Sequence, residues 1–134
     1  MLDFLQCQGE CFISFATSFD ENNPPESVLE KRDSSFWITT GMFPQMLVVS
    51  LVQPTKISKI KIISSNINLL LVETSSHTEA DGFELKSKMT LPYSDGHLQI
   101  TEVPINDIHI RHVRLNIRSG FNHFVAVYKV LLEK

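Results

Sequence analysis

The stretch "FELKSKMTL", Phe83 to Leu91, decides the fold class because its apolar and polar residues alternate. Successive side chains of a β-strand point to opposite faces, so this alternation predicts a strand with one face buried against a core. The side chains that we expect on the buried face are Phe83, Leu85, Met89 and Leu91.

The same period of two recurs along the chain. In "KISKIKII", residues 56–63, we expect Ile60 and Ile62 to point inward. The runs "MLVVSLV" (46–52) and "NLLLV" (68–72) are too continuous for a strand with only one buried face, which favours central positions in the fold. Further short segments rich in β-branched and aromatic residues are "CFISFAT", "HLQITEV", "HVRLNI" and "FVAVYKVLL".

Turn signals such as "DENNPPE", "SSN", "ADG", "SDG" and "RSG" separate these segments, a pattern typical of a β-sandwich or barrel. Only "PPESVLEKR", residues 24–32, is typical of a helix, since Pro25 suits a first turn while Lys31 and Arg32 suit the C-terminal end. We therefore expect a single all-β domain over residues 1–134, with one short helix near residues 25–31.

Length and composition limit the classes of protein. A chain of 134 residues with 43% hydrophobic and 20% charged residues suits one globular domain. A net charge of −3 gives no reason to expect nucleic acid as a partner. The N-terminus lacks the basic region of a signal peptide, and no apolar run reaches the roughly 18 residues of a membrane span. We expect a protein that is not secreted and does not insert into membranes.

Cys7 and Cys11 are the only cysteines. If both lie on one strand, their Cα atoms are about 13 Å apart, too far for a disulfide. We therefore interpret them as reduced thiols of a cytosolic protein. A zinc site is a weak alternative, because no second pair of ligands stands at a recognised spacing.

The segment "IHIRHVRLNIR", residues 108–118, contains a slip in the alternation. A bulge or strand start between Ile110 and Val113 resolves it. The four polar residues that this places together on one face, which we call the basic stripe, are His112, Arg114, Asn116 and Arg118. The stripe is either the solvated face of an edge strand or a docking surface for an acidic partner.

No short motif indicates catalysis. The sequence has no nucleophile elbow, phosphate loop or paired zinc motif, its five histidines are scattered, and its carboxylates form no compact acid–base pair. We therefore expect a protein that is not an enzyme.

The stretch "FWITTGMFPQ", Phe36 to Gln45, gathers bulky residues around one turn. Trp37, the only tryptophan, together with Phe36, is expected to anchor the loop to the core. Met42 and Phe43 lie between a glycine and Pro44, at a loop tip, where bulky residues are candidate contacts for a partner.

Three segments carry a resemblance to a known family: "FATSFDENNPPESVLE" (15–30), "SSFWITTGMFPQMLVVSL" (34–51) and "RLNIRSGFNHFVAVYKV" (114–130). They resemble the intraflagellar transport protein 25 family, also known as heat-shock protein beta-11. The resemblance runs from about residue 14 to the C-terminus, although residues 67–105 match only in strand pattern. It implies a galactose-binding-like, discoidin-type jelly roll.

The resemblance also implies a function and a location. Members are non-catalytic subunits of the intraflagellar transport B complex, found in the cytoplasm and the cilium or flagellum. They bind a Rab-like small GTPase, intraflagellar transport protein 27. We expect the partner-facing surface to comprise Met42, Phe43, Pro44, Arg114, Phe121, His123 and Phe124.

The resemblance further implies one calcium ion after the short helix. Carried over by position, the ligands are the carbonyl of Val28 and the side chains of Glu30, Ser35 and Glu133. The turn reads Glu30-Lys31-Arg32, without glycine and with two cations, which opposes calcium binding. The alternative is that Glu30 pairs with a neighbouring lysine or arginine.

Two other functions stay open on the sequence. The first is a module that binds a carbohydrate or a lipid headgroup, because a fold does not fix a function. The second is a DNA-repair scaffold domain, which only His112, Arg114 and Arg118 support.

Overall fold

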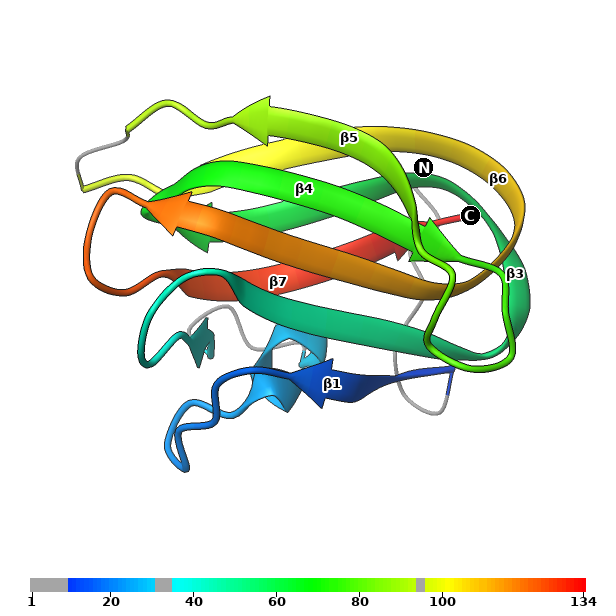
Figure 1. Ribbon diagram of the computed structural model, residues 1–134, viewed down its shortest axis with the longest axis horizontal. Helices are drawn as coiled ribbons and strands as arrows, with labels where there is room; N and C mark the ends of the chain where they lie inside the picture. Colours follow the sequence, from blue (N-terminus) through cyan, green and yellow to red (C-terminus); the bar gives the residue numbers. More distant parts are fainter. Residues whose placement is uncertain (1–9, 31–34, 94–95) are drawn as a thin grey trace.

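The computed structural model describes residues 10–30, 35–93 and 96–134 (Figure 1). Its elements are β1 (Cys11–Ala16), η1 (Pro25–Leu29), β2 (Trp37–Ile38), β3 (Gln45–Ser65), β4 (Ile67–Ser75), β5 (Glu84–Thr90), β6 (Gln99–Gly120) and β7 (Ala126–Glu133). All strand pairs within these ranges are antiparallel. The predicted all-β jelly-roll sandwich with one short helix is confirmed.

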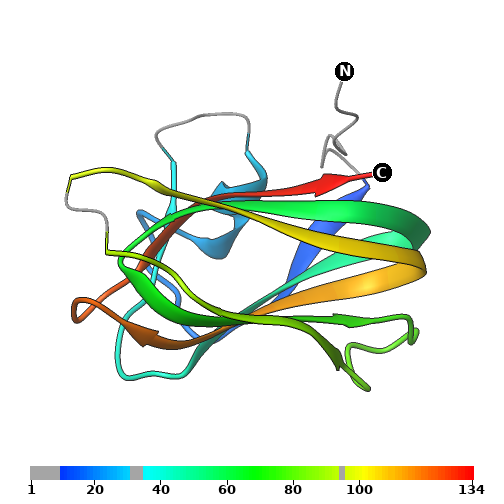
Figure 2. The same cartoon turned by 90° about the horizontal axis from the view of Figure 1, so that it is seen from above.

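The two long strands β3 and β6 build both layers of the sandwich. In the first layer, the N-terminal half of β3 pairs with the C-terminal half of β6, from Gln45↔Ile117 to Ser50↔His112. Strands β1, β4 and β5 complete this layer. After irregular pairing around residues 51–58, β3 pairs with β7 and with the start of β6 in the second layer. Figures 1 and 2 show both strands curving where they pass from one layer to the other. Such bends let one strand serve two sheets.

The sequence predicted separate short strands where the structure has β3 and β6. "MLVVSLV" and "KISKIKII" belong to one strand, as do "HLQITEV" and "HVRLNI". The prediction of central positions for "MLVVSLV" and "NLLLV" is confirmed, since β3 and β4 each have a neighbour on both sides.

The core lies between the two layers. Ile60 and Ile62 are fully buried, as their alternation predicted. From the first layer, Leu47, Val49, Leu115 and Ile117 are also fully buried, and from the second Val103, Val127, Val130 and Leu132. Burying this apolar surface stabilises the fold by roughly 25 cal/mol per Å² removed from water.

The predictions that Phe83 and Leu85 face the core are wrong. Leu85 is 54% exposed and the Phe83 ring lies over the Arg114 guanidinium, whereas Leu91 on the same parity is buried. The pairing of β4 with β5 shifts register between Val72 and Glu73, so one residue of β5 is left over beside Leu85. Such a bulge moves the residues before it to the other face.

The interpretation of Cys11 as a reduced thiol is also wrong, because Cys11 is disulfide-bonded. The prediction assumed that one strand holds both cysteines, whereas β1 begins at Cys11. Cys7 lies outside the described residues.

The predicted slip in "IHIRHVRLNIR" is confirmed, because the β3–β6 register shifts between Ile110 and His112. The interpretation of the basic stripe as a solvated edge is wrong. Strand β6 lies between β3 and β4, and the side chains of His112 and Asn116 are buried. An edge strand would leave one row of backbone groups unpaired, which the two neighbours of β6 prevent.

The helix predicted near residues 25–31 is the five-residue 3-10 helix η1. Pro25 lies in its first turn, as predicted. Lys31 and Arg32, expected at its C-terminal end, lie outside the described residues. No helix among residues 10–30, 35–93 and 96–134 is long and apolar enough to span a membrane.

Candidate partner-binding site

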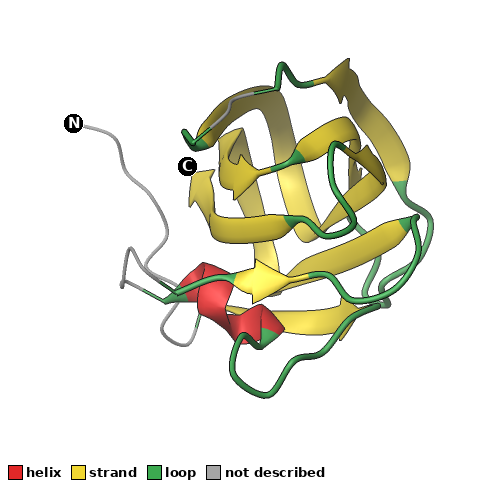
Figure 3. Cartoon of the chain, turned by 90° about the vertical axis from the view of Figure 1, so that its left-hand side faces the viewer, coloured by secondary structure: helices red, strands yellow, loops and turns green. Residues whose placement is uncertain are grey.

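Three loops meet at the end of the sandwich where β3 begins and β6 ends (Figures 1 and 3). They contain residues 39–44, residues 91–93 and 96–98, and residues 121–125, and we call this region the loop end. A Cβ added at Gly120 would lie 2.9 Å from Cζ of Phe43, so glycine is needed for the Phe43 ring to pack there. Phe121 meets Tyr93 edge to face, with ring centroids 5.4 Å apart.

Trp37 anchors the first of these loops. Its side chain is fully buried, and Nε1–H donates a hydrogen bond of 3.0 Å to the Ser18 carbonyl. Phe36 is half-buried against Tyr128, with ring centroids 5.2 Å apart. Phe36 thus packs against β7 of the second layer, and Trp37 bonds the segment that contains Ser18. These contacts agree with the anchoring role that the sequence suggested for both.

Polar side chains that the sequence analysis missed fix the turn after Trp37. The buried Gln45 donates from Nε2 to the carbonyls of Thr40, at 3.1 Å, and Met42, at 2.7 Å. Its Oε1 accepts hydrogen bonds from the hydroxyls of Thr17 and Ser18. Ser18 also bonds the backbone N–H of Thr40 at 2.8 Å. These partners are 3 to 28 residues apart, and three of the five bonds span more than 20 residues, so no local motif marks them.

The turn presents Met42 to solvent with 87% of its surface exposed. Phe43 is half-buried against the core, and Pro44 is exposed. Across the loop end, Phe121 and Phe124 are 40% and 43% exposed. His123 is exposed, and its backbone N–H donates to Oδ1 of Asn122. The structure therefore brings together six of the seven residues predicted to face a partner.

Arg114, the seventh, lies away from the loops, on the outer face of the first layer. Its guanidinium makes two hydrogen bonds to the Glu73 carboxylate, of 2.9 and 2.8 Å. The Phe83 ring covers it, with 4.2 Å from Cζ to the ring centroid. The charge of Arg114 is thus engaged within the chain, and this contact gives Phe83 a role that its alternation alone did not indicate.

His112 ties the segment between β4 and β5 to the same face. Its Nε2 lies 3.2 Å from the Thr78 carbonyl, which can only accept, so Nε2 carries the hydrogen. Nδ1 lies 2.6 Å from the Ser50 hydroxyl. Two members of the basic stripe, His112 and Arg114, are therefore engaged in contacts within the chain, whereas Arg118 is exposed.

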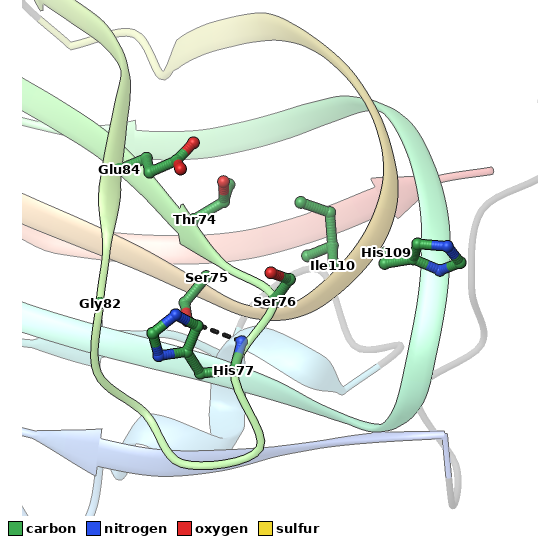
Figure 4. Close-up of a pocket in the computed structure, with 8 residues that line it drawn as sticks. All are labelled: Thr74, Ser75, Ser76, His77, Gly82, Glu84, His109 and Ile110. Atoms are coloured by element: carbon green, nitrogen blue, oxygen red, sulfur yellow. Dashed lines mark hydrogen bonds between the residues drawn. The ribbon is translucent and has the colours of Figure 1, made fainter.

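A hollow of about 260 Å³ lies at the opposite end of the sandwich, where β4 leads into the loop before β5 (Figure 4). Thr74, Ser75, His77, Glu84 and His109 are among the residues that line it. His77 bonds Asp81 through Nδ1 at 2.7 Å, within its own loop. None of the residues predicted to face a partner lines this hollow.

Two of the four candidate calcium ligands, Ser35 and Glu133, have other contacts. Ser35 Oγ accepts a hydrogen bond from the Lys129 ammonium at 3.3 Å and donates to the Ser27 carbonyl at 3.3 Å. Glu133 forms an ion pair of 3.3 Å with Lys59. Val28 is fully buried, and Glu30 is exposed. In the described part of the chain, no three His, Cys, Asp or Glu side chains lie close enough to hold a metal ion.

This donor set does not fit calcium well. Calcium takes six to eight oxygens at about 2.3–2.6 Å and prefers carboxylates. Here a lysine already bonds the hydroxyl of Ser35, and another lysine pairs with the carboxylate of Glu133. Desolvation lowers the pKa of Lys59, but its hydrogen bond to Glu133 and the charges of Glu102 and Glu133 together raise it above its ordinary value.

Comparison with solved structures defines the class of protein. The family 32 carbohydrate-binding module of NanJ from Clostridium perfringens, solved with galactose, superposes with a TM-score of 0.83 at 18% identity, over 100% of both chains. A CBM32 module of the same organism, solved with GalNAc-β-1,3-galactose, gives 0.82 at 19% identity, over 97% of this chain and 99% of that one. The fold is the galactose-binding-like jelly roll.

Sequence relatives define the family. The mouse intraflagellar transport protein 25 homolog is 34% identical over 121 residues, 90% of this chain and 85% of the relative. Intraflagellar transport protein 25 of Chlamydomonas reinhardtii is 33% identical over 130 residues, 97% of this chain and 68% of the relative. No protein-family model matches the chain. The chain belongs to the intraflagellar transport protein 25 family, which associates it with intraflagellar transport and with the cilium or flagellum.

Proposed function

We propose that this protein is a non-catalytic subunit of the intraflagellar transport B complex that binds a Rab-like small GTPase, intraflagellar transport protein 27. In this proposal the chain works in the cytoplasm and the cilium, and the partner alone binds and hydrolyses nucleotide. Membership in the intraflagellar transport protein 25 family supports the transport role. The surface of the loop end supports the role as a binding module.

The observation that carries the proposal is the exposure of Met42 on a turn that is already fixed. A methionine with 87% of its surface in water adds nothing to the core, and Gln45 holds the turn around it through two backbone carbonyls. A side chain presented in this way loses little conformational freedom when a partner covers it. Phe121 and Phe124 add apolar area from the neighbouring loop.

A second apolar surface competes for the role of partner-facing site. The β1–β3 pairing shifts between Ile13 and Phe15, so Phe12 and Phe15 both lie on the outer face of the first layer. They are 47% and 51% exposed, and Leu85 on the same layer is 54% exposed. The loop end is preferred because its most exposed side chain is held on a hydrogen-bonded turn.

The test is binding of the full chain to the Rab-like GTPase of its own organism, measured by calorimetry after co-purification. We expect a one-to-one complex, weakened at least tenfold by Met42→Ala and by Phe121→Ala, since central apolar anchors dominate interface energies. Val52→Ala is the matched control, because Val52 is 52% exposed at the opposite end of the sandwich. It should leave the affinity unchanged.

The other outcomes are informative. If Phe15→Ala weakens the complex and Met42→Ala does not, the partner binds the outer face of the first layer and the loop end is the wrong site. If two folded proteins form no complex at micromolar concentration, the proposed partner is wrong.

A carbohydrate-binding role is the second candidate, because the loop end also carries an exposed aromatic pair. Tyr93, 60% exposed, packs edge to face on Phe121 beside a hollow of about 310 Å³ lined by Asn122 and His123. Aromatic faces beside amide and imidazole groups suit a sugar ring. Binding on a glycan array that Tyr93→Ala abolishes would support this role, and an array without signal would contradict it.

A further inference from the structure

Lys129 is a buried cation on the second layer. It lies on β7, opposite Ile63 of β3, and only 6% of it is exposed. Lysine is almost never buried to this extent unless its ammonium group has partners. Here the ammonium donates to Ser35 Oγ at 3.3 Å, in the segment that connects η1 with β2.

A second hydrogen bond connects Ser35 to the helix η1. Ser35 Oγ donates to the carbonyl of Ser27 at 3.3 Å, and that carbonyl also accepts the backbone N–H of Glu30 at 3.2 Å. Ser27 is buried, and it lies one residue before the fully buried Val28. The Lys129 ammonium, Ser35 Oγ and the Ser27 carbonyl thus form a chain of hydrogen bonds that connects β7 with η1.

This is the calcium site that the family resemblance implied, because Val28 and Ser35 are two of its candidate ligands. We propose that the Lys129 ammonium replaces a metal here, and that it fastens η1 and the start of β2 to β7 without calcium. An ammonium group and a calcium ion both seek carbonyl and hydroxyl oxygens, but the ammonium satisfies them through hydrogen bonds.

Electrostatics support the replacement. A divalent ion bound to Ser35 Oγ would lie within a few ångströms of the ammonium, where like charges repel strongly in a partly buried site. Two carboxylates of the described residues that could offset this repulsion are directed elsewhere. Glu30 is exposed, and Glu133, four residues beyond Lys129 on β7, is paired with Lys59.

The first test is thermal unfolding of the wild-type chain in 5 mM calcium chloride and in excess chelator. We expect the same Tm in both, within about 1 °C, because an ion that binds the folded state must raise the Tm. A clear rise with calcium would overturn the proposal, and this result does not depend on any variant being folded.

The second test is Lys129→Met, which keeps most of the aliphatic stem and removes the charge. We expect the Tm to fall on the order of 5 °C. Hydrogen exchange of the Glu30 amide should become at least tenfold faster, while that of Leu115 in the first layer stays the same. Lys61→Met is the matched control. Lys61 lies on β3, opposite Leu131 of β7, on the same face of the second layer as Lys129, and it is half-buried.

The variant separates the ammonium from its stem. If Lys129→Met is as stable as the wild type and Glu30 is still protected, the stem alone packs there and the proposal is wrong. If Lys61→Met lowers the Tm as much as Lys129→Met does, the loss comes from removing any lysine charge on this face. The specific role of Lys129 is then refuted.

Discussion

Trp37 and Met42 are five residues apart in one short stretch and have opposite environments. Trp37 is fully buried, and Met42 is 87% exposed. Both are large apolar side chains within two residues of a threonine, so their chemistry alone does not separate them. The contrast teaches that a single loop can both fasten itself to a core and present a side chain to a partner.

The difference comes from backbone pairing. Trp37 lies in β2, where it pairs with the buried Val127 of β7, and its side chain points into the core. Met42 follows Gly41, whose φ of +96° reverses the chain at little cost only for glycine. Gln45 then holds the Met42 carbonyl, which leaves the side chain no route back to the core.

Loss of the anchor is the strongest way to break this comparison. We expect Trp37→Ala to lower the free energy of unfolding by about 3–5 kcal/mol, because the large buried side chain leaves a cavity. Urea unfolding followed by circular dichroism measures this, since the variant has no tryptophan to report by fluorescence.

Trp37→Phe serves as the graded control for the anchor. It keeps an aromatic ring but removes the hydrogen bond from Nε1 to the Ser18 carbonyl, so its loss should lie clearly below that of Trp37→Ala. Equal losses would mean that the ring contributes nothing beyond this bond, and an alanine variant as stable as the wild type would show that Trp37 is not an anchor.

Gln45 connects the buried and the exposed halves of the stretch, and its removal has the next largest effect. Gln45→Ala leaves the carbonyls of Thr40 and Met42 without this donor, which should cost about 2 kcal/mol. Gln53→Ala, on the exposed part of the same strand, should cost under about 0.5 kcal/mol. Urea unfolding compares the two, and equal small losses would contradict the role of Gln45 in fixing the turn.

The sequence predicted the features that follow a local period. The alternation in "KISKIKII" placed Ile60 and Ile62 in the core, and the proline of "PPESVLEKR" located η1. These predictions succeeded because each depends on residues only a few positions apart.

Features that depend on distant partners could not be predicted. Leu85 turned outward because of a register shift against β4. Arg114 and His112 of the basic stripe are covered because Phe83 and the segment after β4 fold over them. Gln45 and Lys129 have ordinary sequence surroundings, and only their contacts with Ser18 and Ser35 reveal their roles.

Removal of the Met42 side chain should have the smallest effect on stability and sharpens the comparison most. An exposed side chain that adds nothing to the core can be truncated with a change under about 0.5 kcal/mol in the free energy of unfolding. Urea unfolding of Met42→Ala measures this beside its affinity for the partner. Stability that stays constant while affinity falls would assign Met42 to the interface, because no loss of fold could explain the weaker complex. A loss of stability above about 1 kcal/mol would mean that Met42 packs against the molecule in solution, and that the division of this stretch into anchor and contact is wrong.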